Sequence, residues 1–437
     1  MEALDIIIAP IYFILILGGA YWIRSRVTTA YTRPYFIPAL LLKITGALAA
    51  GFIYQFYYTG GDTFNFFNTS KIIWEAFKED PILGFKVLFA KESSGFSIEV
   101  AKYVNKMYFF GDTSSMGIVR LCALIGLFTF NTYAATAMVF ATLSFSGMWA
   151  LYCVFYDRYP LLYKKIAIAC FFIPSVFFWG SGIFKDSISL GALGWLLYGF
   201  YFGFIQRKNI LKNSLIIVTS AVIIINIKIY ILLCMLPGLL IVYYLQNIAL
   251  VKQPMLKWVI GPVFLIGGFF IGKFALDQIS DFDQRYAINN IATTSKITAD
   301  DIRFVTGKDA GSGYTLNGLD GTTEGMIKLA PQAINVALFR PYLWEVKNIL
   351  MLLSSAESFL FLVFTIVVLF RARVFKIFSF LRKDPWLLFC LFFTLLFAFG
   401  VGVSSFNFGT LSRYKLPLLP FFGIVLAVLN NNLKKTI

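Results

Sequence analysis

The sequence contains no histidine, and only 14% of its 437 residues are charged. Without histidine there is no imidazole to act as a general base or zinc ligand, and no serine–histidine triad can form. Acid–base chemistry therefore falls to carboxylates, lysine or tyrosine. The cysteines lie inside apolar runs without CxxC spacing, so we interpret them as packing residues and not as disulfides or metal ligands. They are Cys122, Cys153, Cys170, Cys234 and Cys390.

Apolar residues dominate what is present. Hydrophobic residues make up 59% of the chain and aromatic residues 18%. A soluble domain has roughly 45–50% apolar and about 25% charged residues. The composition therefore predicts an all-α, polytopic membrane protein whose first partner is the lipid bilayer.

The apolar runs predict about 11 transmembrane helices in a single membrane domain over residues 1–437. A bilayer core of about 30 Å needs roughly 20 apolar residues per helix. We interpret the first run as a retained span, because Glu2 and Asp5 stand where a signal peptide carries positive charge. The predicted spans are 5–23, 37–57, 133–156, 163–180, 186–205, 212–228, 229–246, 258–275, 346–370, 385–403 and 413–430.

Lysine and arginine gather in alternate connections between these spans. The positive-inside rule places those connections in the cytoplasm, the N-terminus outside and the C-terminus in the cytoplasm. Because topology explains most of the net charge of +16, we expect no nucleic-acid partner. The basic residues are Arg24, Arg26, Arg33, Arg158, Lys164, Lys165, Arg207, Lys208, Lys212, Lys252, Lys257, Arg371, Arg373, Lys376, Arg382, Lys383, Lys434 and Lys435.

The outer side then holds two long loops, residues 58–131 and 276–340. Apolar residues between 72 and 89 recur at helical spacing among charges, which predicts helices lying in the membrane interface. We assign residues 117–131 to a short embedded or interfacial helix; if they cross the membrane instead, the N-terminal third is inverted. The second loop is rich in glycine and is predicted to be a flexible surface loop or lid.

The first outer loop opens with Gly60-Gly61-Asp62-Thr63. Two glycines allow a sharp turn and a close approach of the backbone to a ligand. We predict that Asp62 is the catalytic carboxylate. The alternative is an ordinary carboxylate of a solvated loop.

Several cations break the positive-inside pattern, because they lie at the outer ends of predicted spans. Charges near membrane depth are costly unless they pair or face a water-filled cavity, so five cations at one level suggest a shared anion such as a lipid phosphate or pyrophosphate. The alternative is that each side chain reaches lipid headgroups separately. The predicted phosphate- and substrate-binding residues are Lys185, Asp186, Lys228, Arg340, Glu345, Glu357, Arg413, Tyr414 and Lys415.

Two carboxylates in this set have alternative roles. Asp186 follows Lys185 directly and can simply complement the start of a helix. Glu357 lies about 11 residues into a predicted span, roughly 16 Å deep at 1.5 Å per residue. An intramembrane carboxylate is a functional candidate, so Glu357 either binds substrate or pairs with an interior lysine such as Lys273.

The layout resembles the GT-C class of integral-membrane glycosyltransferases and related bacterial envelope-polysaccharide polymerases. The matching features are Asp62 in the first outer loop, residues 174–186 at the second outer turn, and Arg413-Tyr414-Lys415 before Pro417 and Pro420. The chain departs from that class in its single aspartate, its additional first span and the lack of a large soluble domain after the membrane core.

The resemblance implies transfer of a sugar from a polyprenyl-phosphate or polyprenyl-diphosphate donor to a glycan or protein acceptor, at the outer face of the bacterial cytoplasmic (inner) membrane. Asp62 would accept the proton of the acceptor hydroxyl, and Lys185, Arg413 and Lys415, with Lys228 and Arg340, would stabilise the leaving phosphate. No metal ligands are assigned, and the sequence leaves open whether a divalent metal takes part.

Two other functions compete with this one. A transporter or flippase for a lipid-linked or anionic sugar would use the same cations without a base. Against it, the charges lie near one face instead of the bilayer midplane, and no pair of broken helices is visible in the sequence. A non-catalytic envelope scaffold would leave every charge interfacial.

Overall fold

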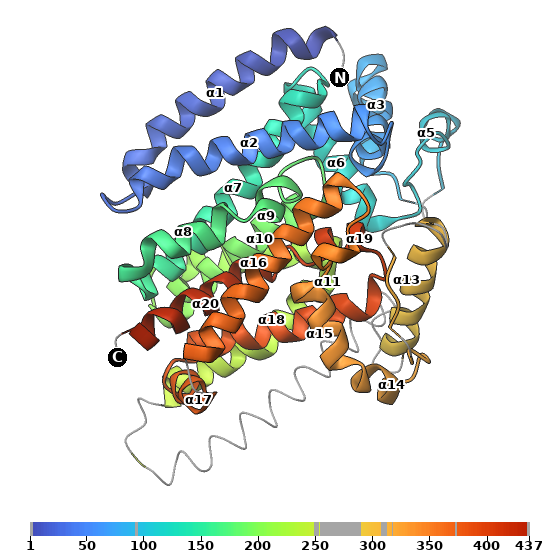
Figure 1. Ribbon diagram of the computed structural model, residues 1–437. Coiled ribbons are helices and arrows are strands. Elements are labelled where there is room, and N and C mark those ends of the chain that lie inside the picture. The colour runs from blue at the N-terminus through green and yellow to red at the C-terminus, as the bar shows by residue number, and fades with distance from the viewer. Residues whose placement is uncertain are drawn as a thin grey trace. The chain divides into compact units, whose positions relative to one another are not determined.

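The structure is a computed structural model that describes residues 3–91, 95–248, 253, 290–306, 313–316, 318–371 and 374–434. Every regular element within these ranges is a helix (Figure 1), so the predicted all-α class is confirmed for them. The chain divides into two compact units, Met1–Leu232 and Leu233–Ile437. The predicted spans at 258–275 and the lysine at 273 lie outside the described residues.

The first unit is built from helices that follow one another through short turns. The last of them, α11, continues into the second unit. The helices are α1 (Ala3–Val27), α2 (Arg33–Phe56), α3 (Asp62–Glu79), α4 (Pro81–Leu88), α5 (Ile98–Val104), α6 (Thr113–Phe128), α7 (Tyr133–Arg158), η1 (Pro160–Leu162), α8 (Tyr163–Phe171), α9 (Pro174–Phe178), α10 (Lys185–Gly199), η2 (Phe200–Ile205) and α11 (Ile210–Ile248).

The second unit holds the remaining described helices. They are α13 (Ile291–Thr306), α14 (Thr323–Lys328), α15 (Ala330–Phe339), η4 (Leu343–Glu345), α16 (Ile349–Arg371), α17 (Val374–Lys383), α18 (Pro385–Ser404), α19 (Phe408–Tyr414) and α20 (Leu419–Lys434).

The described helices fit a membrane. Seven of them are long and apolar enough to cross a bilayer, and the bent pair α19 and α20 adds an eighth if it forms one span. The apolar side chains of α1 are widely exposed, with Ile6 at 77% and Ile14 at 68%. Such a surface is unfavourable in water and well solvated by lipid. The structure supports a polytopic helical membrane protein, and the figure of about 11 spans stays a prediction.

Three places predicted as continuous spans or as a simple hairpin are broken helices. Residues 163–180 form α8 and α9, because Pro174 lacks an N–H and disfavours helical backbone in the residue before it. Helices α19 and α20 meet at a bend of 70°, with Pro417 in the connection. Helix α11 covers both predicted spans 212–228 and 229–246, and its backbone leaves the helical region at Lys228 (φ −148°, ψ 70°).

The two segments predicted to be outer loops, 58–131 and 276–340, are more helical than a loop description suggests. Helices α3 to α6 fill most of residues 58–131, which confirms their helical character, and α6 is 16 residues long. The described parts of residues 276–340 carry α13, α14 and α15. Helix α15 packs on α18 so closely that a Cβ on Gly402 would lie 2.2 Å from the carbonyl oxygen of Ala333. That part of the predicted lid is therefore anchored to a membrane helix.

Close backbone contact also holds the first unit together. Helix α7 packs on α2 and α10 (Figure 1). A Cβ on Gly147 of α7 would lie 1.9 Å from the Gly191 carbonyl oxygen, and one on Gly194 would lie 1.9 Å from that of Gly147. Small residues allow such approaches between membrane helices, where van der Waals packing drives association. The five cysteines all lie within the described residues and form no disulfide there, and Cys122, Cys170 and Cys390 are buried.

The first unit also contains a buried lysine, Lys43, that was not among the residues singled out in the sequence. Lys43 of α2 is fully buried. Its ammonium donates to Ser144 Oγ at 3.1 Å, to the carbonyl oxygen of Val176 at 3.0 Å and to that of Gly180 at 2.7 Å. These three acceptors match the three donors of an ammonium group. They tie α2 to α7 and to the end of α9.

We predict that Lys43→Met destabilises the folded protein. The substitution removes the donor to Ser144 and to two carbonyl oxygens, and a buried polar group left without a partner costs about 1–3 kcal/mol. Thermal unfolding of the purified protein in detergent, followed by tryptophan fluorescence, should show a clear fall in Tm. Lys86→Met, at an exposed position of α4, is the matched control. Equal Tm values for the two variants would contradict the prediction.

Candidate functional site

The turn before Asp62 has the geometry that its glycines predict. Gly60 (φ 146°) and Gly61 (φ 118°) both have positive φ, a region that side chains other than glycine rarely adopt. A Cβ on Gly61 would lie 2.7 Å from the ring of Tyr54. Asp62 is the first residue of α3. The need for glycine at both positions is therefore confirmed, and the close approach is to an aromatic ring of α2.

The same tyrosine reaches the turn that carries Lys185. The Tyr54 ring centroid lies 5.6 Å from that of Phe184, and Phe184 is the residue before the first turn of α10. Trp179 and Phe178 complete this aromatic cluster. Tyr54 thus packs against both turns and sets their separation.

Lys185 lies in a cluster of opposite charges. Its ammonium contacts Asp112 Oδ2 at 3.1 Å and Ser114 Oγ at 2.5 Å. The charges of Asp62 and Lys228 also act on it. The side chain of Lys185 is 23% exposed and that of Asp112 48%. The structure therefore brings four predicted site residues of the first unit together, because Lys228 in turn pairs with Asp186.

Asp112 is held in its ionised form. Partial burial opposes ionisation, but hydrogen bonds from Ser115 and Ser114 and the charge of Lys185 outweigh it and bring the pKa of Asp112 to about 2. The same carboxylate caps α6, since its Oδ1 accepts a hydrogen bond from the Ser114 N–H at 3.1 Å. Asp112 is thus fixed by a helix end on one side and by Lys185 on the other.

Lys228 and Asp186 form a buried ion pair. Their side chains are 7% and 2% exposed. Lys228 lies at the backbone break of α11, and Asp186 lies in the first turn of α10. Breaking such a pair leaves an uncompensated buried charge, which costs about 3–5 kcal/mol. This burial indicates that the pair positions α10 beside α11.

In the second unit, Arg340 pairs with Glu345. Both side chains are 20% exposed, and the Arg340 guanidinium lies over the ring of Phe408 at 5.2 Å and that of Tyr314 at 5.6 Å. Burial opposes ionisation of Glu345, but hydrogen bonds from Arg340 and from the Tyr342 N–H leave its pKa below the usual range. The arginine is therefore held over aromatic rings by a carboxylate.

Ser358 connects this pair to the predicted intramembrane charges. Its hydroxyl donates to the Arg340 carbonyl oxygen at 3.1 Å and accepts from the Lys415 ammonium at 3.0 Å. Lys415 is 1% exposed and Glu357 4%, and the charge of Glu357 acts on Lys415. Of the two roles predicted for Glu357, pairing with an interior lysine has a partner here in Lys415.

Arg413 and Tyr414 lie half-buried in the last turn of α19, directly before the bend at Lys415. Within the described residues, no group of three or more histidine, cysteine, aspartate or glutamate side chains is placed to hold a metal ion. The predicted cations thus fall into two clusters, one in each unit. Each cluster contains its own carboxylates.

Asp112 was missed in the sequence, although a signal for it is present. The tripeptide Gly-Asp-Thr occurs at residues 61–63 and again at 111–113, and the two aspartates stand at the starts of α3 and α6. These helices pack on each other. The repeated tripeptide therefore marks two carboxylates that both act on Lys185.

The chain matches no family model, no curated protein and no solved structure. We therefore infer its function from the geometry of these two clusters.

We predict that the bond between Asp112 and Lys185 makes stability depend on acid pH. The pKa of Asp112 falls from an ordinary 3.8 to about 2 in the folded protein, so its contribution is present above about 3.8 and is lost as the pH falls towards 2. The Tm difference between the parent and Asp112→Asn should therefore shrink over that range. Asp300→Asn, at an exposed position of α13, is the control. A difference that is constant with pH would contradict the assignment.

Proposed function

We propose that this chain is a membrane glycosyltransferase. It would move a sugar from a polyprenyl-phosphate or polyprenyl-diphosphate donor to a glycan or protein acceptor, at the outer face of a bacterial cytoplasmic membrane. The observation that carries the proposal is the charge cluster at the ends of apolar helices, in which Lys185 contacts Asp112 at 3.1 Å and the charge of Asp62 also acts on Lys185. A carboxylate and an accessible cation at the end of membrane helices are the two groups that this reaction needs.

The two groups divide the reaction between them. Asp62 accepts the proton of the acceptor hydroxyl as its oxygen bonds to the anomeric carbon. The bond between that carbon and the lipid phosphate breaks, and the electron pair leaves with the phosphate oxygen. Lys185 stabilises the resulting negative charge. A lipid phosphate neutralised in this way leaves without a second strong acid.

Lys185 is suited to this role by its partial exposure. An ammonium has three donors, and the contacts with Asp112 and Ser114 use two of them. The phosphate would bind the third donor and compete with the half-exposed Asp112. The buried pair of Lys228 and Asp186 takes no part in the exchange and fixes the end of α10. The proposal rests on the first unit alone.

A transporter or flippase is the second candidate, and the broken helices favour it. Transporter sites are built at discontinuities of membrane helices, where buried charges meet irregular backbone. Lys228 lies at the break of α11 and Lys415 at the bend between α19 and α20. Both lysines are buried. This role would need no base.

We predict that Asp62→Asn lowers the transfer rate by about 10²-fold or more, the usual contribution of a general base. The assay uses the purified chain in liposomes with polyprenyl phosphates that carry labelled hexoses or pentoses. It follows release of free polyprenyl phosphate and labelling of the acceptor. Asp300→Asn is the matched carboxylate control. Movement of intact lipid-linked sugar without turnover, unchanged by Asp62→Asn, would support the transporter and overturn the enzyme.

We also predict that the turn before Asp62 faces the outside. Thr59 is exposed in this turn, whereas Thr63 is buried and hydrogen-bonded to the Tyr133 hydroxyl at 2.7 Å, so position 59 is the better probe. In intact cells, a membrane-impermeant maleimide should label Thr59→Cys and leave Lys208→Cys unlabelled until the cells are opened. The parent protein measures the background of its own cysteines. The reverse result would place Asp62 in the cytoplasm and exclude an outer-face site.

A further inference from the structure

A cavity of about 310 Å³ lies on the face of α3 that carries Phe64, Phe67, Asn68 and Lys71. These four residues recur at helical spacing, and Asp62 is not among the residues that line the cavity. The opposite face of α3 packs through Phe66 on Phe109, with ring centroids 4.8 Å apart. The cavity is therefore separate from the charge cluster and shares with it only the first turn of α3 and the loop before it.

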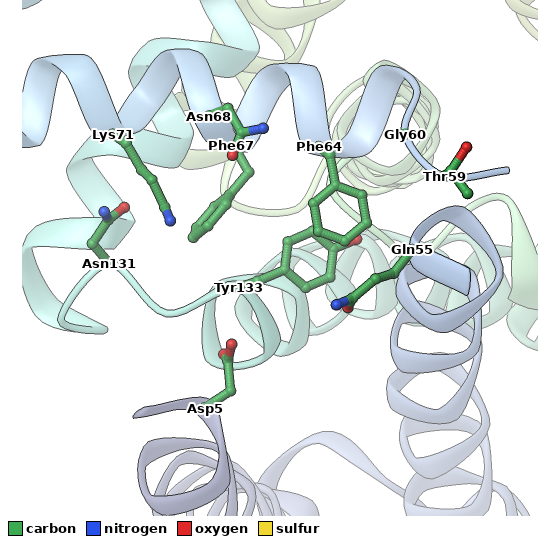
Figure 2. Close-up of a pocket in the computed structure, with 10 residues that line it drawn as sticks. All are labelled: Asp5, Gln55, Thr59, Gly60, Phe64, Phe67, Asn68, Lys71, Asn131 and Tyr133. Carbon is green, nitrogen blue, oxygen red and sulfur yellow. The ribbon is translucent and has the colours of Figure 1, made fainter. Parts of the chain in front are cut away.

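The polar lining of the cavity is electrically balanced and rich in amides. It consists of Asp5, Gln55, Thr59, Asn68, Lys71 and Asn131. Figure 2 shows the Asp5 carboxylate, the Lys71 ammonium and the Gln55 amide directed towards the space beside the Tyr133 ring. One carboxylate and one ammonium balance each other, and each amide can both donate and accept hydrogen bonds. The lining suits a neutral ligand with many hydroxyl groups better than an anion.

Asp5 is held in place by the backbone. Its Oδ1 accepts a hydrogen bond from the Ala134 N–H at 2.8 Å, which joins the start of α1 to the first turn of α7. Asn131 lies in the turn before α7 and has a positive φ of 51°. Both polar groups of the lining therefore lie beside the start of α7, and the helix end fixes the carboxylate.

Aromatic rings form the apolar side of the cavity. The rings of Phe64 and Tyr133 stack at a centroid distance of 4.5 Å, and Phe67 meets Tyr133 edge-on at 5.3 Å. The Tyr133 hydroxyl is occupied by Thr63, so this side offers ring surface and no phenol. Aromatic surface opposite several amides complements a pyranose, which has C–H groups on its faces and hydroxyls around its edge.

We propose that this cavity binds one neutral sugar unit of the acceptor glycan. Its volume is at the lower end of the roughly 300–1,000 Å³ found for ligand pockets, which fits a single ring and excludes an extended lipid or peptide. The acceptor role rests on the proposed function, because Gly60 and Phe64 line the cavity on either side of Asp62. The sugar binding itself does not depend on transfer.

The experiment is saturation-transfer difference NMR with the full chain in nanodiscs. The probes are glucose, galactose, mannose, N-acetylglucosamine and their disaccharides. At least one probe should receive saturation at its ring C–H protons. Asn68→Leu should weaken its binding about three- to tenfold, the loss expected for one hydrogen bond. Asn68 is exposed on α3, and Asn105→Leu, at an exposed amide just after α5, is the matched control that should bind like the parent.

The outcomes separate this proposal from the transferase. Absence of saturation transfer with every probe, or equal binding by the Asn68→Leu variant and the parent, would overturn the sugar site whatever the transfer assay gives. Binding that is weakened in Asn68→Leu and retained in Asp62→Asn supports the site. If Asp62→Asn also leaves the transfer rate unchanged, the role of Asp62 as the base is overturned while the sugar site stands.

Discussion

The buried ammonium of Lys43 is the interaction on which the first unit depends. Removing a charge from water costs several kcal/mol, and the cost is offset only when the surroundings supply good hydrogen bonds. Lys43 finds its acceptors on two other segments, at Ser144 of α7 and at the carbonyl oxygens of Val176 and Gly180. A shift of α9 or of the following turn would leave the ammonium unsatisfied. Lys43 therefore restricts where the chain can enter α10.

Helix α2 carries this constraint to the candidate site. Lys43 and Tyr54 are 11 residues apart on α2, about 16 Å along its axis. Lys43 of α2 donates a hydrogen bond to the Gly180 carbonyl oxygen. Tyr54 of α2 packs on Gly61 and Phe184. The turn that ends in Lys185 is thus held at both ends by one helix. Asp62 and Lys185, distant in sequence, come within electrostatic reach of each other because the turns that carry them both pack on this helix.

For the charge cluster around Lys185, the sequence identified most of the residues but not which of them form pairs. Charges at the ends of apolar runs can be recognised in the sequence. The sequence could therefore place four residues near the same face of the membrane: Asp62, Lys185, Asp186 and Lys228. The sequence could not predict how these residues pair, because pairing depends on which helices pack together. Asp112 was identified as the partner of Lys185 only from the structure. Lys43 was hidden for another reason: an apolar run tolerates one lysine without losing its average hydropathy. The break at Lys228 coincides with the boundary predicted between spans 212–228 and 229–246, whereas the bend between α19 and α20 falls inside the predicted span 413–430.

Burial separates the charge pairs by what each can do. The pair of Lys185 and Asp112 is partly exposed, so an incoming phosphate can exchange with the carboxylate while the backbone stays in place. The pair of Lys228 and Asp186 is buried at a helix break, and opening it would leave a charge without compensation unless the helices moved. An enzyme requires only the first event, whereas alternating access requires the second. The two functions therefore differ in which ion pair must open. Opening of the Lys185 pair is required for the enzyme, and opening of the Lys228 pair is required for the transporter.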